Sequence, residues 1–164
     1  MPLVKRILFL LALSVLFSCE AHSRLPNQRP QNFSIFFQQS NVGMRGLGRS
    51  AKLHIKAPQG EYIVEEYSHE GKNKTVKRFS VTSKDLDFLY KQFKKYRFNE
   101  ISVQREEVRD RFDGPSIEIQ LNDKRISKSN TGTDFIKGDS LVRFQAIIKQ
   151  LHDFKNQKLL PRRP

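Results

Sequence analysis

Cysteine and tryptophan are the scarcest residue types in this 164-residue chain, which has one cysteine, Cys19, and no tryptophan. A single cysteine cannot form an internal disulfide, so the fold must be stabilised by its hydrophobic core alone. Thirteen phenylalanines supply much of the apolar volume for that core. Because Cys19 lies next to the N-terminal apolar run, no cysteine is left to act as a nucleophile in the folded part.

Catalytic motifs are also lacking. The four histidines fit neither the H-E-x-x-H pattern nor another zinc-ligand spacing, and no G-x-S-x-G nucleophile motif occurs. We therefore expect no enzymatic activity, no metal and no cofactor. One alternative stays open, in which His54 and His69 meet across neighbouring strands beside carboxylates, as a hydrolase would need. The four histidines are His22, His54, His69 and His152.

The sequence has no apolar run long enough to span a bilayer as a helix, which takes roughly 20 residues. Its longest apolar run covers residues 7–17 and follows two basic residues, Lys5 and Arg6. A basic start, a short apolar run and a small residue at its end are typical of a secretory signal peptide. The sequence therefore predicts a signal peptide over residues 1–18.

The end of that run reads Leu16-Phe17-Ser18-Cys19 and resembles the lipobox of bacterial lipoproteins. The resemblance implies that residues 1–18 are removed and that Cys19, as the new N-terminus, is acylated. More than one acyl chain would hold the protein stably to a membrane of the bacterial cell envelope. The alternative is an ordinary cleaved signal followed by a free Cys19 thiol. The choice between the inner and the outer membrane stays open.

Basic residues outnumber acidic ones, 30 to 17, and the formal net charge is +13. A nucleic-acid partner is one interpretation of such a charge, but an exported lipoprotein rarely meets nucleic acid, so we expect none. The basic residues are scattered along the chain, which favours solvated surfaces. The alternative is attraction to anionic headgroups or another anionic polymer of the envelope, where each basic group near the surface adds about 1 kcal/mol.

Composition also divides the chain into segments. Residues 19–32 are polar, contain two prolines and show no periodicity, so the sequence predicts a flexible tether after the lipidated cysteine. A single folded domain is expected over residues 33–154. The remaining residues, 155–164, are basic and end in proline, and we expect them to form a frayed tail.

Short stretches of alternating apolar and polar residues predict strands separated by turns. The clearest covers residues 51–57, where Leu53 and Ile55 face one way while Lys52 and His54 face the other. The expected strands form a meander followed by a hairpin, whose last strand is a basic sheet edge that discourages pairing with other chains. The other strands are expected over residues 33–39, 61–67, 75–81, 116–121 and 124–129.

Two stretches with helical periodicity follow the meander and the hairpin. Thr82 and Asp85 match a capping box, and apolar residues at helical spacing continue to about Tyr96. A second helix is expected after a cap at Asp139 or Ser140. The sequence therefore predicts an α+β fold in which an antiparallel sheet carries two amphipathic helices on one face.

A glycine-rich stretch joins the first two expected strands. Its spacing, G-x-x-G-x-G, matches neither the dinucleotide-binding order nor a phosphate-binding loop. The favoured interpretation is a mobile connection between strands. The alternative is a partner-contact loop, because exposed loops often carry binding residues. The residues of this loop are Gly43, Met44, Arg45, Gly46, Leu47 and Gly48.

The pattern of residues 40–48, 82–98 and 114–121 resembles small uncharacterised α+β domains of bacterial lipoproteins. It is also distantly similar to emfourin-type inhibitors of thermolysin-like metallopeptidases, which would imply an inhibitory contact by residues 40–50. We expect a lipid-anchored, non-enzymatic envelope protein that binds another envelope component, either a protein or an anionic polymer. The alternatives are an inhibitor of a metallopeptidase and an envelope hydrolase.

Overall fold

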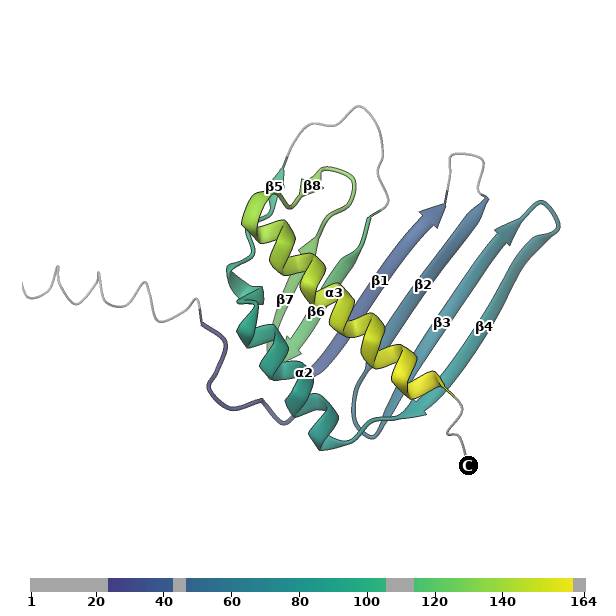
Figure 1. Ribbon diagram of the computed structural model, residues 1–164. Helices are drawn as coiled ribbons and strands as arrows, with labels where there is room; N and C mark the ends of the chain where they lie inside the picture. Colours follow the sequence, from purple (N-terminus) through teal and green to yellow (C-terminus); the bar gives the residue numbers. More distant parts are fainter. Residues whose placement is uncertain (1–23, 43–46, 106–113, 161–164) are drawn as a thin grey trace, which may run out of the picture.

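A computed structural model describes residues 24–42, 47–105 and 114–160 of the chain. Within them, a six-stranded antiparallel sheet carries two helices on one of its faces, and a separate pair of short strands lies at one end (Figure 1). This architecture confirms the predicted α+β fold. None of the described helices is long and apolar enough to cross a membrane.

The first four strands form the predicted meander. They are β1 (Ser34–Val42), β2 (Gly48–Ile55), β3 (Gln59–Ser68) and β4 (Gly71–Ser80), and each pairs antiparallel with the next. Only a few residues join β2 to β3 and β3 to β4. Such short connections keep consecutive strands next to each other in the sheet.

The chain then crosses to the other side of β1 and adds the predicted hairpin. Strand β6 (Ser116–Leu121) pairs with β1, and β7 (Lys124–Ser129) forms the outer edge. The strand order is therefore β4-β3-β2-β1-β6-β7. The basic strand predicted as a sheet edge is β7, and it lies at one edge of the sheet. The separate pair consists of β5 (Gln104–Arg105) and β8 (Asp134–Phe135).

Helix α2 (Ser83–Lys95) starts with the predicted capping box. The backbone N–H of Asp85 donates to Thr82 Oγ1 at 3.2 Å, and the backbone N–H of Thr82 donates to Asp85 Oδ2 at 2.7 Å. Lys158 Nζ contacts the same Asp85 oxygen at 2.7 Å, which ties the first turn of α2 to the end of the last helix, α3 (Gly138–Leu159). A short 3-10 helix, η1 (Phe98–Glu100), follows α2.

Helix α3 (Gly138–Leu159) runs diagonally across the sheet beside α2 (Figure 1). The cap predicted at Asp139 or Ser140 is wrong, because both residues lie inside the first turn. Asp139 pairs instead with Arg143 at 3.0 Å, one turn along the helix. The residue at the N-cap position makes no side-chain hydrogen bond to the helix end.

The end of α3 also differs from the prediction of a frayed tail over residues 155–164. The helix continues to Leu159, and two lysines of its last turns contact the rest of the domain. Lys155 Nζ lies 4.8 Å from the centre of the Tyr62 ring, and Lys158 pairs with Asp85. These contacts explain why the basic stretch stays helical up to that point. Residues 161–164 lie outside the described part of the chain.

The hydrophobic core lies between the two helices and the sheet face that they cover, and it is rich in phenylalanine. The Phe33 ring packs edge to face against Tyr90, with centroids 5.1 Å apart, and Phe93 packs in the same way against Phe98 at 4.9 Å. These rings join the start of β1 to α2 and η1. The largest fully buried side chains are Phe33, Phe93, Phe98, Phe144, Ile35, Leu53, Ile55, Leu86, Leu89, Ile101, Ile117 and Ile119.

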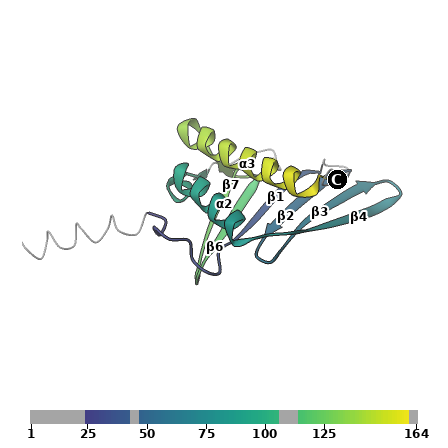
Figure 2. The ribbon, with the colours of Figure 1, turned by 60° about the horizontal axis from the view of Figure 1, so that its bottom comes forward.

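The opposite face of the sheet carries no described helix (Figure 2). We call it the open sheet face; in β1 to β4 it is formed by alternate residues such as Phe36, His54, Ile63 and Val76, which follow from the strand register. Phe36 and Val76 are large apolar side chains exposed on it. The sheet is therefore packed on one side and bare on the other, as antiparallel sheets commonly are.

Candidate functional site

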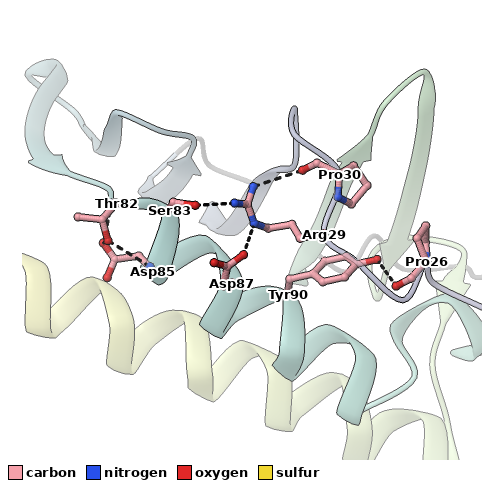
Figure 3. A network of polar contacts seen from close by, with 8 residues as sticks. All are labelled: Pro26, Arg29, Pro30, Thr82, Ser83, Asp85, Asp87 and Tyr90. Carbon is pink, nitrogen blue, oxygen red and sulfur yellow. Dashed lines mark hydrogen bonds and ion pairs between the residues drawn. The ribbon is translucent and has the colours of Figure 1, made fainter.

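Residues 24–32, which precede β1, form the N-terminal segment and lie along α2 in the opposite direction (Figure 3). The sequence predicts a flexible tether that extends to residue 32. In the structure these residues are instead bound to the domain, so the domain begins before the predicted boundary at Phe33. Residues 19–23 of the predicted tether lie outside the described residues.

Arg29 fixes the middle of the N-terminal segment to the first turns of α2. Its Nε donates to Asp87 Oδ1 at 2.7 Å, and its Nη2 donates to Ser83 Oγ at 2.8 Å. Its Nη1 donates to the backbone carbonyl oxygen of Pro30 at 3.2 Å. Because a guanidinium group is planar and its donors point in fixed directions, the three bonds hold this side chain in one orientation.

The start of the N-terminal segment is held by Leu25 and Tyr90. Leu25 is 7% exposed and packs into the hydrophobic core. The Tyr90 hydroxyl donates to the carbonyl oxygen of Pro26 at 2.8 Å, and burial raises the pKa of Tyr90, which keeps the hydroxyl protonated as a donor. Burial of a leucine side chain contributes about 1.5–3 kcal/mol, so Leu25 supplies much of the energy that docks the segment.

The end of the N-terminal segment is bound to the turn between β6 and β7. The backbone N–H of Asn122 donates to Asn32 Oδ1 at 2.7 Å, and Asn32 Nδ2 donates to the Asn122 carbonyl oxygen at 3.0 Å. Asn122 has a φ of 53°, a left-handed turn conformation that asparagine tolerates. This pair of bonds joins two positions that are 90 residues apart in the sequence.

Periodicity does not reveal the N-terminal segment, because a short extended stretch has none. The sequence features that could have indicated a docked segment are single residues within it. Leu25 is the one large apolar residue among polar neighbours, and Pro26 and Pro30 each fix one backbone angle. A chain restricted in this way has less conformational entropy to lose when it docks, so a few contacts suffice to hold it.

Two cavities flank the N-terminal segment. The basic cavity, of about 560 Å³, lies between the segment and the exposed side of α2. The turn cavity, of about 530 Å³, lies between the segment, η1 and the β6–β7 turn, and Asn99 in its lining has a buried Nδ2 without a hydrogen-bond partner within the described residues. The basic cavity is lined by Asn27 and Arg29 from the segment and by Asp87, Tyr90, Lys91, Lys94 and Lys95 from α2.

A separate charged cluster lies on the open sheet face, around Glu65. Its carboxylate, 10% exposed, contacts Lys72 Nζ at 2.7 Å, Lys52 Nζ at 3.4 Å and the Tyr67 hydroxyl at 3.2 Å. The hydrogen bond from Lys72 is the largest effect on the pKa of Glu65; burial opposes it, Tyr67 and Lys52 add to it, and the pKa falls to about 2. Glu65 is therefore ionised at neutral pH, and two lysines share its charge.

Of the predicted contact loop, residues 43–46 lie outside the described part of the chain, as does the predicted lipidation residue Cys19. Leu47 is half-buried. Gly48 opens β2, and its φ of 148° lies in the region that favours glycine. Gly48 thus has a structural role at the start of the strand, and partner contact by the loop stays a prediction.

The histidine pair that a hydrolase would need is not brought together. His54 lies opposite the first residues of β3, whereas His69 follows the end of that strand, about 25 Å away at the usual rise of a strand. His152 packs edge to face against Phe37, and burial lowers its pKa. His22 lies outside the described residues, and within them no group of three or more His, Cys, Asp or Glu side chains is placed to hold a metal ion.

No protein-family model matches the chain, and no curated protein sequence matches it. The function must therefore be inferred from the N-terminal segment, the cavities beside it and the open sheet face.

Proposed function

We propose that the protein is a lipid-anchored, non-enzymatic protein of the bacterial cell envelope that binds another envelope component. The lipobox-like residues 16–19 support attachment through Cys19. The docking of the N-terminal segment on α2 is the observation that carries the proposal, because it gives an anchored domain a defined orientation.

The path from the proposed anchor to the domain is short. A fully extended chain advances at most about 3.6 Å per residue, so the five steps from Cys19 to Arg24 span no more than about 18 Å. Because residues 24–32 are bound to α2 and to the β6–β7 turn, they add no free length to that path. In the anchored protein, the side formed by α2 and the N-terminal segment therefore faces the membrane.

The open sheet face is then accessible to a partner, and we assign partner binding to it. It carries the apolar side chains Phe36, Ile63 and Val76 among charged groups that include the cluster around Glu65. Apolar side chains surrounded by polar ones are typical of surfaces that bind other proteins. We therefore expect the envelope partner to be a protein.

Acylation of Cys19 tests the anchor. Cells supplied with a labelled fatty acid are expected to label the native protein and not a Cys19→Ser variant, because Cys19 is the only cysteine in the chain. The intact mass of the native protein should correspond to a chain that starts at Cys19 and carries acyl groups. A native chain without acyl mass would contradict the proposal.

Crosslinking in intact cells tests the partner surface. A photoreactive residue placed at Phe36 or Val76 is expected to capture one envelope protein reproducibly. The matched control is Val142, which is also an exposed apolar side chain but lies on α3. Equal capture of that protein from Val142, or no capture from either sheet position, would show that the open sheet face is not the binding surface.

A further inference from the structure

The basic cavity has the size and the walls of a small-ligand site. Asn27 and Arg29 of the N-terminal segment form one wall, and three lysines of α2 stand on the other, Lys91, Lys94 and Lys95. Its volume of about 560 Å³ falls within the range of about 300–1,000 Å³ that is usual for small-ligand sites. Two segments far apart in the sequence thus border one open hollow.

Positive charge in the basic cavity is only partly neutralised. Arg29 is paired with Asp87 at 2.7 Å, and Asp87 is the one carboxylate in the lining. Within the described residues, Lys91, Lys94 and Lys95 form no ion pair with a carboxylate. Three ammonium groups around one hollow attract an anionic ligand.

The lysines keep hydrogens for such a ligand. Lys94 Nζ contacts the backbone carbonyl oxygen and Oδ1 of Asn27, each at 3.3 Å, which holds it at the cavity wall. Lys95 Nζ lies 5.3 Å from the centre of the Tyr96 ring. This cation–π contact leaves N–H groups of the ammonium available to donate hydrogen bonds to a ligand. Lys91 and Lys95 are one helical turn apart and exposed, so both can reach a common ligand.

The phosphodiester group of a lipid headgroup suits this arrangement. Its two non-bridging oxygens share one negative charge, and each can accept more than one hydrogen bond, so several lysines can contact the group at once. Lysine is a common phosphate ligand and acts as a point charge that adapts to the position of the group. The nearest abundant phosphate groups to an anchored domain are those of the lipid headgroups.

We propose that the basic cavity binds the phosphate of an anionic phospholipid headgroup. This inference rests on the proposed membrane anchor, which places the cavity beside the bilayer, because Asn27 follows Arg24 by only three residues. Headgroup binding would hold the domain at a second point, in addition to the lipid on Cys19. Free inorganic phosphate offers the same chemistry, so the experiment must separate the two sources.

The experiment uses the full-length chain in zwitterionic detergent micelles. It is titrated with a soluble short-chain phosphatidylglycerol or, separately, with inorganic phosphate, and the backbone amide NMR shifts are followed. We expect saturable shifts at residues 91–95 with the phospholipid, and at least a tenfold loss of affinity in the double variant Lys91→Glu, Lys95→Glu. The matched control, Lys56→Glu with Lys77→Glu, makes the same charge change at exposed sites away from the cavity and should keep the native affinity.

Three results would overturn the proposal. An equal loss of affinity in the two double variants would indicate general charge attraction. If inorganic phosphate bound as tightly as the phospholipid, the ligand would not be a lipid headgroup. An absence of saturable shifts would show that the basic cavity is not a binding site. Thermal unfolding checks that both double variants are folded. If the Lys91→Glu, Lys95→Glu variant is not folded, the milder single variant Lys91→Gln replaces it. The titration does not require acylation of Cys19, so it tests headgroup binding independently of the proposed lipid anchor. The acyl mass of the native protein tests the anchor.

Discussion

Glu65 is a largely buried carboxylate on the face of the sheet that no described helix covers. The hydrogen bond from Lys72 is the main cause of its low pKa, which is about 2 in the folded protein against 4.5 as the ordinary value. Because the folded-state pKa lies below that of the unfolded chain, the ionised carboxylate stabilises the fold above pH 4.5. That contribution is lost as the pH falls from 4.5 through 2.

Replacement of this carboxylate should therefore flatten the acid dependence of stability. We expect the free energy of unfolding, measured by urea denaturation, to fall less between pH 4.5 and pH 2 in Glu65→Gln than in the native chain. Glu66→Gln is the matched control, because Glu66 is 59% exposed and its contact with Arg49 is 3.8 Å long. An acid dependence as steep in Glu65→Gln as in the native chain would contradict the role of the cluster.

At the scale of elements, the N-terminal segment acts as part of the fold although it is neither helix nor strand. Arg29, Tyr90 and Asn32 bind it by hydrogen bonds, each of which contributes about 0.5–1.5 kcal/mol net. Leu25 is its only side chain in the hydrophobic core. Leu25 should therefore decide whether the segment stays docked.

Leu25→Ala is expected to lower the free energy of unfolding by about 2 kcal/mol, the low end for buried leucines, because Leu25 lies at the edge of the core. Hydrogen exchange at the amides of residues 24–32 should become faster in this variant. Leu160→Ala, at a side chain that is 67% exposed, is the control and should change neither measurement. If Leu25→Ala unfolds like the native chain, the segment is a tether after all.

The two helices show why one start was predictable and the other was not. The capping box of α2 is local, since Thr82 and Asp85 are three residues apart, and the sequence pattern is enough to identify it. The start of α3 depends on distant partners. Ser140 Oγ accepts a hydrogen bond from the backbone N–H of Ser102, and Asp139 is used by an ion pair within the helix, so neither serves as the cap.

At the scale of the whole molecule, apolar periodicity in the sequence predicts the sheet and both helices. It does not predict the candidate site. Alternation predicts which side chains of a strand face inward, but the convergence of Lys52 and Lys72 on Glu65 depends on the register of three strands. The basic cavity depends on a contact between Asn27 and Lys94, which are 67 residues apart. Such pairings need the three-dimensional fold, because no local pattern encodes them.

The docked N-terminal segment also affects how the anchored protein would meet its neighbours. A domain joined to a lipid by a long linker tumbles, and it presents every side equally often. If Cys19 is acylated, the linker shortened by docking would limit how far the domain can turn relative to the membrane, so another protein in the same leaflet would approach it from a restricted set of directions. Restricted rotation raises the share of encounters that are correctly aligned, and it speeds association without any change in the contacts themselves.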